Sequence, residues 1–327
     1  MKTVAQDQVE TKHRLITRSN FDGIVNTALL QKINLIDDIL YVHPKDVQEG
    51  KVAVTDQDIV SNLPYVENAF MAFDHQLDMP EVMKLNKNHA LFTDVSSVSE
   101  IIFDYYGGEE VFGKEVSAMV EAANRSKRTD FSKEEVLSPR GWDQLIFLTD
   151  PRTGLGHFKS FRISNKALMK KLPQLLLTYD IEALLQTPDV KERVDLCEKY
   201  HEDFIAQLKR VTKVKEGIAV IDLRAEEVVY PGNRYMVYAL FPEVEVSVHI
   251  LRGVENKNSV FALGKSIFHK HEALNMRDIA SVYHGGGHSD AATCQVAHHE
   301  SDAVLHDIVS RLQQQMIKSR EELCATS

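Results

Sequence analysis

Acidic side chains and one histidine stand directly after short apolar runs in the N-terminal part of the chain, and together they could bind a divalent metal. Asp56, Asp74 and Asp94 each end such a run, and Asp22 follows the first run, "HRLIT", after a short turn. Carboxylate oxygens and an imidazole such as that of His75 are ligands that Mn²⁺ accepts. One Asp at a strand end can simply cap the helix that follows. Four in this arrangement favour a carboxylate cluster.

A second constellation is "YHGGGHSD" at 283–290, in which Gly285, Gly286 and Gly287 stand between two histidines, His284 and His288. Three consecutive glycines are costly to order on folding, so their placement needs a reason. Backbone N–H groups without neighbouring Cβ atoms can form a nest for a phosphate, and a histidine can donate a further hydrogen bond. The alternative is a glycine-rich turn between a helix and a strand.

Short apolar runs alternate with helical patterns in the first part of the chain. A helix is predicted over "GIVNTALLQKI", and strands are predicted at 13–17, 38–43, 51–56, 67–74 and 89–94. This alternation is typical of an α/β fold with a largely parallel sheet. Ligands of such sheets bind at the carboxyl ends of the strands, which is where the acidic residues fall.

The rest of the chain divides into a helical middle, from 96 to 215, and a second α/β block. In that block we predict strands at 217–224, 244–253, 259–266 and 292–299. We predict helices at 232–241 and 275–284, and then a terminal amphipathic helix. A chain of 327 residues suits two domains. We predict one domain over 1–200 and a smaller one over 216–327, joined by a helical linker over 201–215.

Composition and charge narrow the possible functions. A net charge of −10 and a pI near 5.8 do not indicate a binder of long duplex nucleic acid, and an anionic substrate would need a metal or clustered basic groups. Cys197, Cys294 and Cys324 are too far apart for a disulfide framework or a metal-ligand spacing, which indicates a reducing cytoplasm. The sequence has no apolar signal core and no stretch approaching the roughly 20 apolar residues of a membrane span. We therefore expect a cytoplasmic protein with no membrane partner.

Three motifs occur in a fixed order: "ITRSNFDGIV", then "FDHQ" at 73–76, then "GGGH" at 285–288. This ordered set resembles the DHH phosphoesterase superfamily with its C-terminal DHH-associated domain, over nearly the whole chain. The stretches "HPKD", "DYYGG", "TGLG" and "GKSIF" are similar to those of bacterial exopolyphosphatase-related proteins. The resemblance implies an α/β fold with a parallel-sheet N-terminal domain, a smaller α/β C-terminal domain and an active cleft between them.

The resemblance also implies a metal site in the N-terminal domain. The metal ligands would be Asp22, Asp56, Asp74, His75 and Asp94, and the catalytic residues would be Arg18, Asp22, Asp74 and His75. Asn20 stands where the family usually has Asp, and Gln76 stands where it usually has His. Arg18 stands where many relatives carry a metal-binding His, and its guanidinium can neutralise phosphate but cannot ligate a metal. One Mn²⁺ or Mg²⁺ ion is therefore favoured over two.

In the C-terminal domain the resemblance implies a substrate-binding wall. Arg234 and Lys265 match places where the family carries basic groups, and the three glycines with His288 would contact substrate phosphates. The alternative for Arg234 and Lys265 is that they are ordinary surface cations. The basic cluster "RSKR" at 125–128 is interpreted as a solvated helix end.

The favoured function is that of a metal-dependent phosphoesterase acting on small phosphate-rich anions. These include short oligonucleotides, nucleotide phosphates, cyclic dinucleotides and polyphosphate. Asn20 and Gln76 would attenuate the activity by weakening a second metal position. The alternative is a catalytically degenerate relative that binds such an anion as a sensor or interaction module. The expected partners are the small phosphate-bearing substrate and, as one arrangement, a second copy in a homodimer.

Overall fold

The computed structural model describes residues 12–74, 88–91, 95–253, 257–269 and 274–326, without the side chains of Leu91 and of residues beyond 318. The chain forms two compact units. The first consists of Met1–Asp130 and Pro139–Leu196, and the second consists of Phe131–Ser138 and Cys197–Ser327. A short segment in the middle of the first unit's sequence therefore belongs to the second unit.

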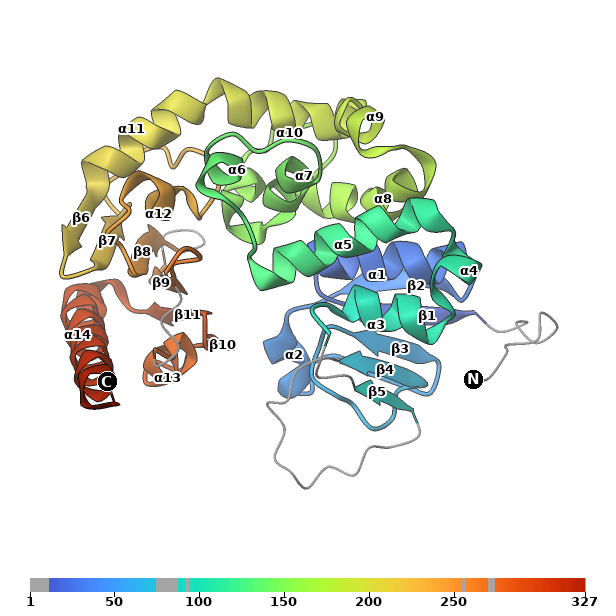
Figure 1. The fold of residues 1–327 in the computed structure, drawn as a ribbon, viewed down its shortest axis with the longest axis horizontal. Helices are drawn as coiled ribbons and strands as arrows, with labels where there is room; N and C mark the ends of the chain where they lie inside the picture. The colour runs from blue at the N-terminus through green and yellow to red at the C-terminus, as the bar shows by residue number, and fades with distance from the viewer. Residues whose placement is uncertain (1–11, 75–87, 92–94, 254–256, 270–273, 327) are drawn as a thin grey trace. The chain divides into compact units, whose positions relative to one another are not determined.

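The first unit is built on a five-stranded sheet in the order β2-β1-β3-β4-β5 (Figure 1). The strands are β1 (His13–Thr17), β2 (Ile36–Tyr41), β3 (Asp58–Ser61), β4 (Met71–Asp74) and β5 (His89–Leu91). Every pairing between neighbours is parallel, so the carboxyl ends of all five strands share one edge. The prediction of a parallel α/β sheet is confirmed.

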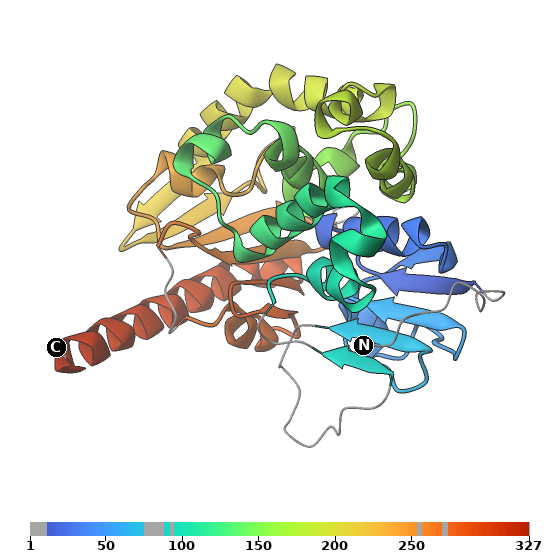
Figure 2. The same ribbon diagram turned by 45° about the vertical axis from the view of Figure 1, so that its right-hand side comes forward.

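Helices cover both faces of this sheet. On one face lie α1 (Phe21–Lys32), α3 (Val98–Tyr105) and α5 (Lys114–Arg128), and α2 (Pro44–Gln48) packs on the other (Figures 1 and 2). Phe73 of β4 contacts Tyr105 and Tyr106 at the end of α3, with ring centroids 5.5 and 6.1 Å apart. Its neighbour Ala72 points the other way, into a cluster with Val47 of α2, as the period of two in a strand requires.

The rest of the first unit is helical. Its elements are α4 (Gly108–Phe112), α7 (Gly141–Thr149), the 3-10 turns η1 (Pro151–Thr153) and η2 (Leu155–His157), α8 (Asn165–Thr178), α9 (Ile181–Leu185) and the greater part of α10 (Pro188–Lys199). The predicted helical middle is thus confirmed, but it ends at α11 (His201–Val211), because Thr212–Lys215 form a strand of the second sheet.

The second unit is built on a six-stranded mixed sheet in the order β10-β11-β9-β8-β7-β6. The strands are β6 (Thr212–Lys215), β7 (Ile218–Asp222), β8 (Val246–Arg252), β9 (Ser259–Lys265), β10 (Gly286–His288) and β11 (Ala291–Val296). Beside α11, its helices are α6 (Lys133–Leu137), α12 (Met236–Leu240), α13 (Met276–Ser281), the 3-10 turn η4 (His298–Glu300) and α14 (Ser301–Thr326). Val248 and Phe261 of the sheet pack with Ile279 of α13 and Leu312 of α14 in its core.

No helix within the described residues is long and apolar enough to span a membrane.

The predicted strand over 51–56 is wrong, because that segment is irregular and the strand begins at Asp58. The two valines of the segment alternate as they would in a strand, but they pack against the cluster beneath α2 instead. The Asp58 carboxylate accepts hydrogen bonds from the N–H and the hydroxyl of Thr55, at 2.7 and 3.0 Å. These bonds close a turn before the strand. Asp56 lies in this turn, at the amino end of β3.

Candidate functional site

The turn from β1 into α1 brings Arg18, Asn20 and Asp22 to the carboxyl edge of the first sheet. Asn20 caps α1, and its side-chain oxygen accepts a hydrogen bond from the N–H of Gly23 at 3.0 Å. A Cβ atom on Gly23 would lie 2.0 Å from the backbone oxygen of Arg18. Glycine is therefore required where the helix passes this close to the turn, and the conformation of the turn is fixed.

Asp22 is buried, with 1% of its surface exposed, against the start of α3. Its Oδ1 accepts a hydrogen bond from the N–H of Ser99 at 3.0 Å and lies 2.7 Å from the Ser99 hydroxyl. Its Oδ2 accepts from the N–H of Val98 at 3.4 Å. The first N–H groups of a helix have no partner within the helix and favour a negative charge. Asp22 is therefore held firmly, and Oδ2 is the less saturated oxygen.

Asn62 follows the carboxyl end of β3, beside the end of β1. Its backbone is left-handed, with φ of 56°, and its side-chain amide donates to Oδ1 of Asn20 at 3.1 Å. Asn62, not Asp56, is thus the polar residue that follows β3. With a usual rise of about 3.3 Å per residue, the length of β3 separates Asp56 from this edge by about 13 Å. The structure does not bring Asp56 to the other predicted ligands.

A continuous set of buried hydrogen bonds supports the strand ends from beneath. The hydroxyls of Thr17 and Ser61 are 3.0 Å apart, and the side-chain amide of Asn26 donates to Ser61 Oγ at 3.2 Å. The Ser99 hydroxyl lies 2.7 Å from both Asn26 Oδ1 and Asp22 Oδ1, and it can donate its one proton to either. Such paired networks hold their members in one arrangement. The network joins β1, β3, α1 and α3 at the position of Asp22.

The ammonium of Lys127, from the last turn of α5, reaches the same edge. Its Nζ lies 4.0 Å from Asp22 Oδ2 and donates to Asn62 Oδ1 at 3.5 Å, and 19% of the side chain is exposed. Burial lowers the pKa of Lys127 and the charge of Arg18 lowers it further, while Asp22 and Asp74 raise it. The interpretation of "RSKR" as a solvated helix end is therefore wrong for Lys127.

Arg18 adds positive charge beside Lys127, and Arg152 in turn acts on Arg18. Burial lowers the pKa of the Arg18 guanidinium, and the charge of Arg152 lowers it further, while Asp22 and Asp150 raise it. Arg152 lies in η1 and forms a two-pronged ion pair with Asp150, at 2.9 and 3.0 Å. The strand ends thus combine fixed cations with a small number of acidic groups, which suits an anionic ligand.

Asp74 is the last residue of β4 and is 6% exposed. Together with Asp22 it is a predicted metal ligand that the structure places at the carboxyl edge. The predicted positions His75, Gln76 and Asp94 lie outside the described residues. Within the part of the chain that is described, no three His, Cys, Asp or Glu side chains form a metal-binding group.

Gly286 and Gly287 of GGGH begin β10, an edge strand of the second sheet that pairs antiparallel with β11, and Gly285 directly precedes it. A Cβ on Gly285 would lie 2.4 Å from the backbone oxygen of Thr293. Gly287 has φ of 152°, and a Cβ there would lie 2.4 Å from the backbone oxygen of Ala291. Gly286 differs, because nothing lies within 4 Å of a Cβ built on it. Packing explains two of the glycines and leaves Gly286 unexplained.

The other predicted substrate-binding residues have partners within the second unit. Lys265 Nζ forms an ion pair with Asp290 at 3.0 Å, and its side chain is 8% exposed. The guanidinium of Arg234 stacks on the ring of Tyr235, 4.2 Å from its centroid, and donates to its hydroxyl. His288 is exposed, and its Nδ1 accepts from the N–H of Asp290 at 3.4 Å. The role of these side chains in binding substrate stays a prediction.

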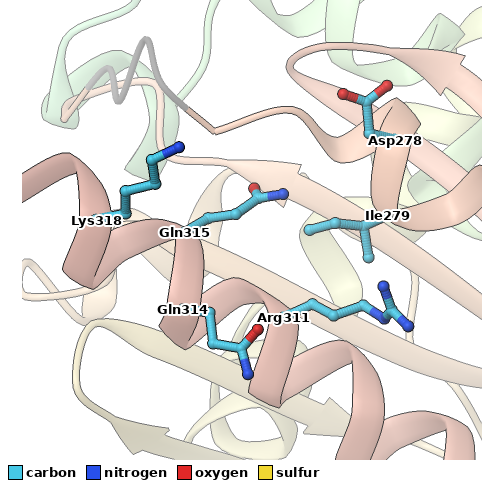
Figure 3. Close-up of a pocket in the computed structure, with 6 residues that line it drawn as sticks. All are labelled: Asp278, Ile279, Arg311, Gln314, Gln315 and Lys318. Carbon is cyan, nitrogen blue, oxygen red and sulfur yellow. The ribbon is translucent and has the colours of Figure 1, made fainter.

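A separate pocket of about 280 Å³ lies between α13 and α14 of the second unit. Figure 3 shows its lining residues: Asp278, Ile279, Arg311, Gln314, Gln315 and Lys318. Arg311 donates to Asp307 at 2.7 Å. The lining holds one carboxylate and neither histidine nor cysteine, so it offers no catalytic constellation.

A parallel sheet with acidic and basic groups at its carboxyl edge, followed by a separate mixed-sheet unit that carries GGGH, defines a two-domain phosphoesterase of the DHH type. The solved structures agree. The pGpG-specific phosphodiesterase PggH from Vibrio cholerae is 42% identical to this chain, with a TM-score of 0.78, over 93% of this chain and 100% of that chain. The chain belongs to the DHH phosphoesterase superfamily.

More distant structures share the fold. RecJ from Thermus thermophilus, solved in complex with Mn²⁺, is 13% identical, with a TM-score of 0.54 over 92% of this chain and 52% of that chain. An exopolyphosphatase-related protein from Bacteroides fragilis is also 13% identical, with a TM-score of 0.53 and 92% of each chain covered. No protein-family model and no curated protein sequence matches the chain. The likeness to exopolyphosphatase-related proteins is therefore one of fold, while the likeness to PggH extends to sequence.

Sequence reasoning missed Asn62 and Lys127. Asn62 had a local signal, because it is the polar residue directly after the apolar run "DIVS". Lys127 had none, because its position depends on how α5 packs on α1 and α3.

Proposed function

We propose that this protein is a metal-dependent phosphodiesterase that hydrolyses a short linear dinucleotide such as pGpG. The observation that carries this proposal is the 42% identity to a pGpG-specific phosphodiesterase over 93% of the present chain. In this reaction water adds to the internal phosphorus, the bond to the 3′ oxygen breaks, that oxygen takes a proton, and two molecules of GMP result.

The charges at the carboxyl edge support the proposal. A phosphodiester gains negative charge on its oxygens as water attacks, and groups already positioned to meet that charge give the largest catalytic effect. Arg18 and Lys127 supply positive charge near Asp22, within a protein whose net charge is −10. Arg18 would contact a phosphate oxygen through its guanidinium fork, because it cannot ligate a metal.

In this proposal one divalent ion binds at the carboxyl edge, and Asp22 and Asp74 are the described residues that would contact it. Asp22 offers Oδ2, because Oδ1 is already engaged by Ser99, and Asp74 offers a second carboxylate. With the predicted ligands His75 and Asp94, these two residues would hold the ion. A bound Mn²⁺ or Mg²⁺ would polarise a phosphoryl oxygen and lower the pKa of its water. Asp22 would keep its position through its bonds to the start of α3.

In the second unit, GGGH supports binding of a terminal phosphate. Gly286 has no packing reason to be glycine, and the glycine leaves its backbone open to close approach by a ligand. Lys265 is mostly buried and already paired with Asp290. In this proposal Lys265 therefore acts by fixing the loop after His288, while the backbone at Gly286 contacts the phosphate.

A substrate panel tests the proposal. The purified protein is incubated with Mn²⁺ and separately with pGpG, pApA, cyclic di-GMP and polyphosphate, and products are separated by liquid chromatography. We expect GMP from pGpG, and a loss of at least about 100-fold in kcat/KM for Asp74→Asn, as for removal of one key electrostatic group. Asp56→Asn, at the opposite end of β3, is the matched control and should keep full activity. Phosphate release from polyphosphate without cleavage of pGpG would refute the proposal.

The alternative of a catalytically degenerate anion-binding module rests on Asn20, whose side-chain oxygen is engaged by Gly23 and Asn62. Calorimetric binding of pGpG in the presence of Mn²⁺, without any GMP formed over hours, would favour that alternative.

A further inference from the structure

We propose that the ammonium of Lys127 takes the place of the second divalent cation of a two-metal phosphoesterase site. The proposal rests on the proposed function for the presence of one ion at this edge. The ammonium stands between Asp22 Oδ2, at 4.0 Å, and Asn62 Oδ1, at 3.5 Å. Asp22 lies in the first turn of α1, which follows β1, and Asn62 follows β3.

The amides at this edge match a single positive charge better than a double one. A divalent ion in a site of hard oxygen ligands relies on carboxylates to balance its charge. Asn20 and Asn62 are neutral, and they are hydrogen-bonded to each other at 3.1 Å. Asn20 Oδ1 also accepts the N–H of Gly23, so both of its bonds are directed inside the protein. A monovalent cation with one carboxylate, Asp22, leaves this part of the site balanced.

Lys127 is unlike the surface cations of the same helix. Arg128, the next residue, is exposed and donates to Glu121 at 2.7 Å, as in an ordinary surface pair. Lys127 is turned inward, and its ammonium donates to an amide oxygen while standing 4.0 Å from the nearest oxygen of Asp22. An ammonium placed only for stability would be expected to donate directly to the carboxylate. The spacing suits a cation that still has donors for a further anion.

A fixed ammonium changes how the site depends on metal. Lys127 stays at the site at every metal concentration because it is part of the chain, whereas a bound ion leaves when the metal is removed. Its three N–H donors can direct a phosphate oxygen towards the acidic edge without any ion. Lys127 is therefore assigned to substrate binding and charge neutralisation, beside the single ion expected at Asp22 and Asp74.

Counting bound Mn²⁺ tests the assignment without any nucleotide. Free Mn²⁺ is followed by electron paramagnetic resonance while the ion is titrated into each protein. We expect one ion per chain for the native protein and two for the double variant Lys127→Met with Asn62→Asp, which removes the ammonium and introduces a carboxylate. Lys114→Met, at the exposed start of the same helix, is the matched control and should stay at one.

The possible results separate the two proposals. Two ions in the native protein, or an unchanged count in the double variant, would overturn the role of Lys127. A count that rises from zero to one would support Lys127 and contradict the single ion of the proposed function. Folding is checked by circular dichroism with and without Mn²⁺. A double variant that folds only with Mn²⁺ supports the replacement of the ammonium by an ion, and one that stays unfolded in Mn²⁺ overturns it.

Discussion

Replacing Gly286 by alanine separates the binding role of the GGGH motif from its structural role. The added Cβ meets nothing within 4 Å, and the backbone there does not have a positive φ. Where the backbone accepts alanine without strain, Gly→Ala stabilises a protein by about 0.4–1 kcal/mol, because the unfolded chain loses freedom. At about 2–4 °C per kcal/mol for a domain of this size class, the melting temperature should rise by about 1–4 °C.

Ligand binding should respond in the opposite direction. If a phosphate contacts the backbone N–H at this position, the new methyl group holds the phosphate away. A hydrogen bond to a charged group contributes about 1.5–3 kcal/mol, and each 1.4 kcal/mol is a factor of ten in Kd. The Gly286→Ala variant should therefore bind a phosphate-bearing ligand about 10- to 100-fold more weakly while being slightly more stable.

Two measurements and one control decide the matter. Isothermal titration calorimetry with GMP, which cannot be cleaved by a phosphodiesterase, gives Kd, and scanning calorimetry gives the melting temperature. Gly287→Ala is the control for structural damage, because its Cβ would lie 2.4 Å from the backbone oxygen of Ala291. It should lower the melting temperature. If Gly286→Ala binds GMP as well as the native protein, the backbone at this glycine does not touch the phosphate and the reasoning fails.

Further predictions concern stability. Ser99→Ala removes the hydroxyl that lies 2.7 Å from both Asp22 and Asn26, all of them buried, and should lower the free energy of unfolding in urea by about 1–3 kcal/mol; a loss below about 0.5 kcal/mol would mean that the network does not hold Asp22. In the second unit, hydrogen bonds from Arg210 are the main cause that lowers the pKa of Glu226 to about 2. The folded state therefore favours the charged carboxylate, so this stabilisation is complete above the ordinary value of 4.5 and is lost as pH falls towards 2. Glu226→Gln should be less stable than the native protein at pH 7, by a modest amount because Arg210 is exposed. In thermal melts the melting temperatures of the two proteins should converge as the pH is lowered. A difference that persists at pH 2 would show that the ion pair is not its cause.

The sequence was sufficient to predict those parts of the fold that depend on local pattern. The run 13–17 followed by Asp22-Gly23 predicts a strand turning into a helix, because apolar residues precede a helix cap and a close-packed glycine. The same reasoning wrongly put Asp56 at the end of a strand. Val52 and Val54 alternate as they would in a strand, but they belong to an irregular segment that packs beneath α2. The hydrogen bonds from Thr55 to Asp58 close a turn, and β3 therefore begins at Asp58, two residues after Asp56.

Site residues that come together only through long-range packing could not be predicted from the sequence. Asn62 and Lys127 are 65 residues apart in the chain and meet only because the last turn of α5 lies close to the end of β3. Nothing in the stretch "RSKR" distinguishes the inward lysine from its outward neighbours. The predicted ligands His75 and Asp94 lie outside the described residues and stay predictions.

The segment 131–138 cannot finish folding when it is synthesised, because its partners come later in the chain. It leaves the ribosome in the middle of the first unit, yet its partners belong to the second unit: Asn233 donates to the backbone oxygen of Val136, 97 residues earlier. At about 5–20 residues per second, a ribosome needs about 5–20 s to supply that partner. During this interval the side chains of Phe131 and Val136, which are buried in the folded protein, lack the residues of the second unit that cover them. A nascent chain of this protein therefore carries an uncovered apolar segment until translation is well past the first unit, and we expect chaperones to bind it during that time.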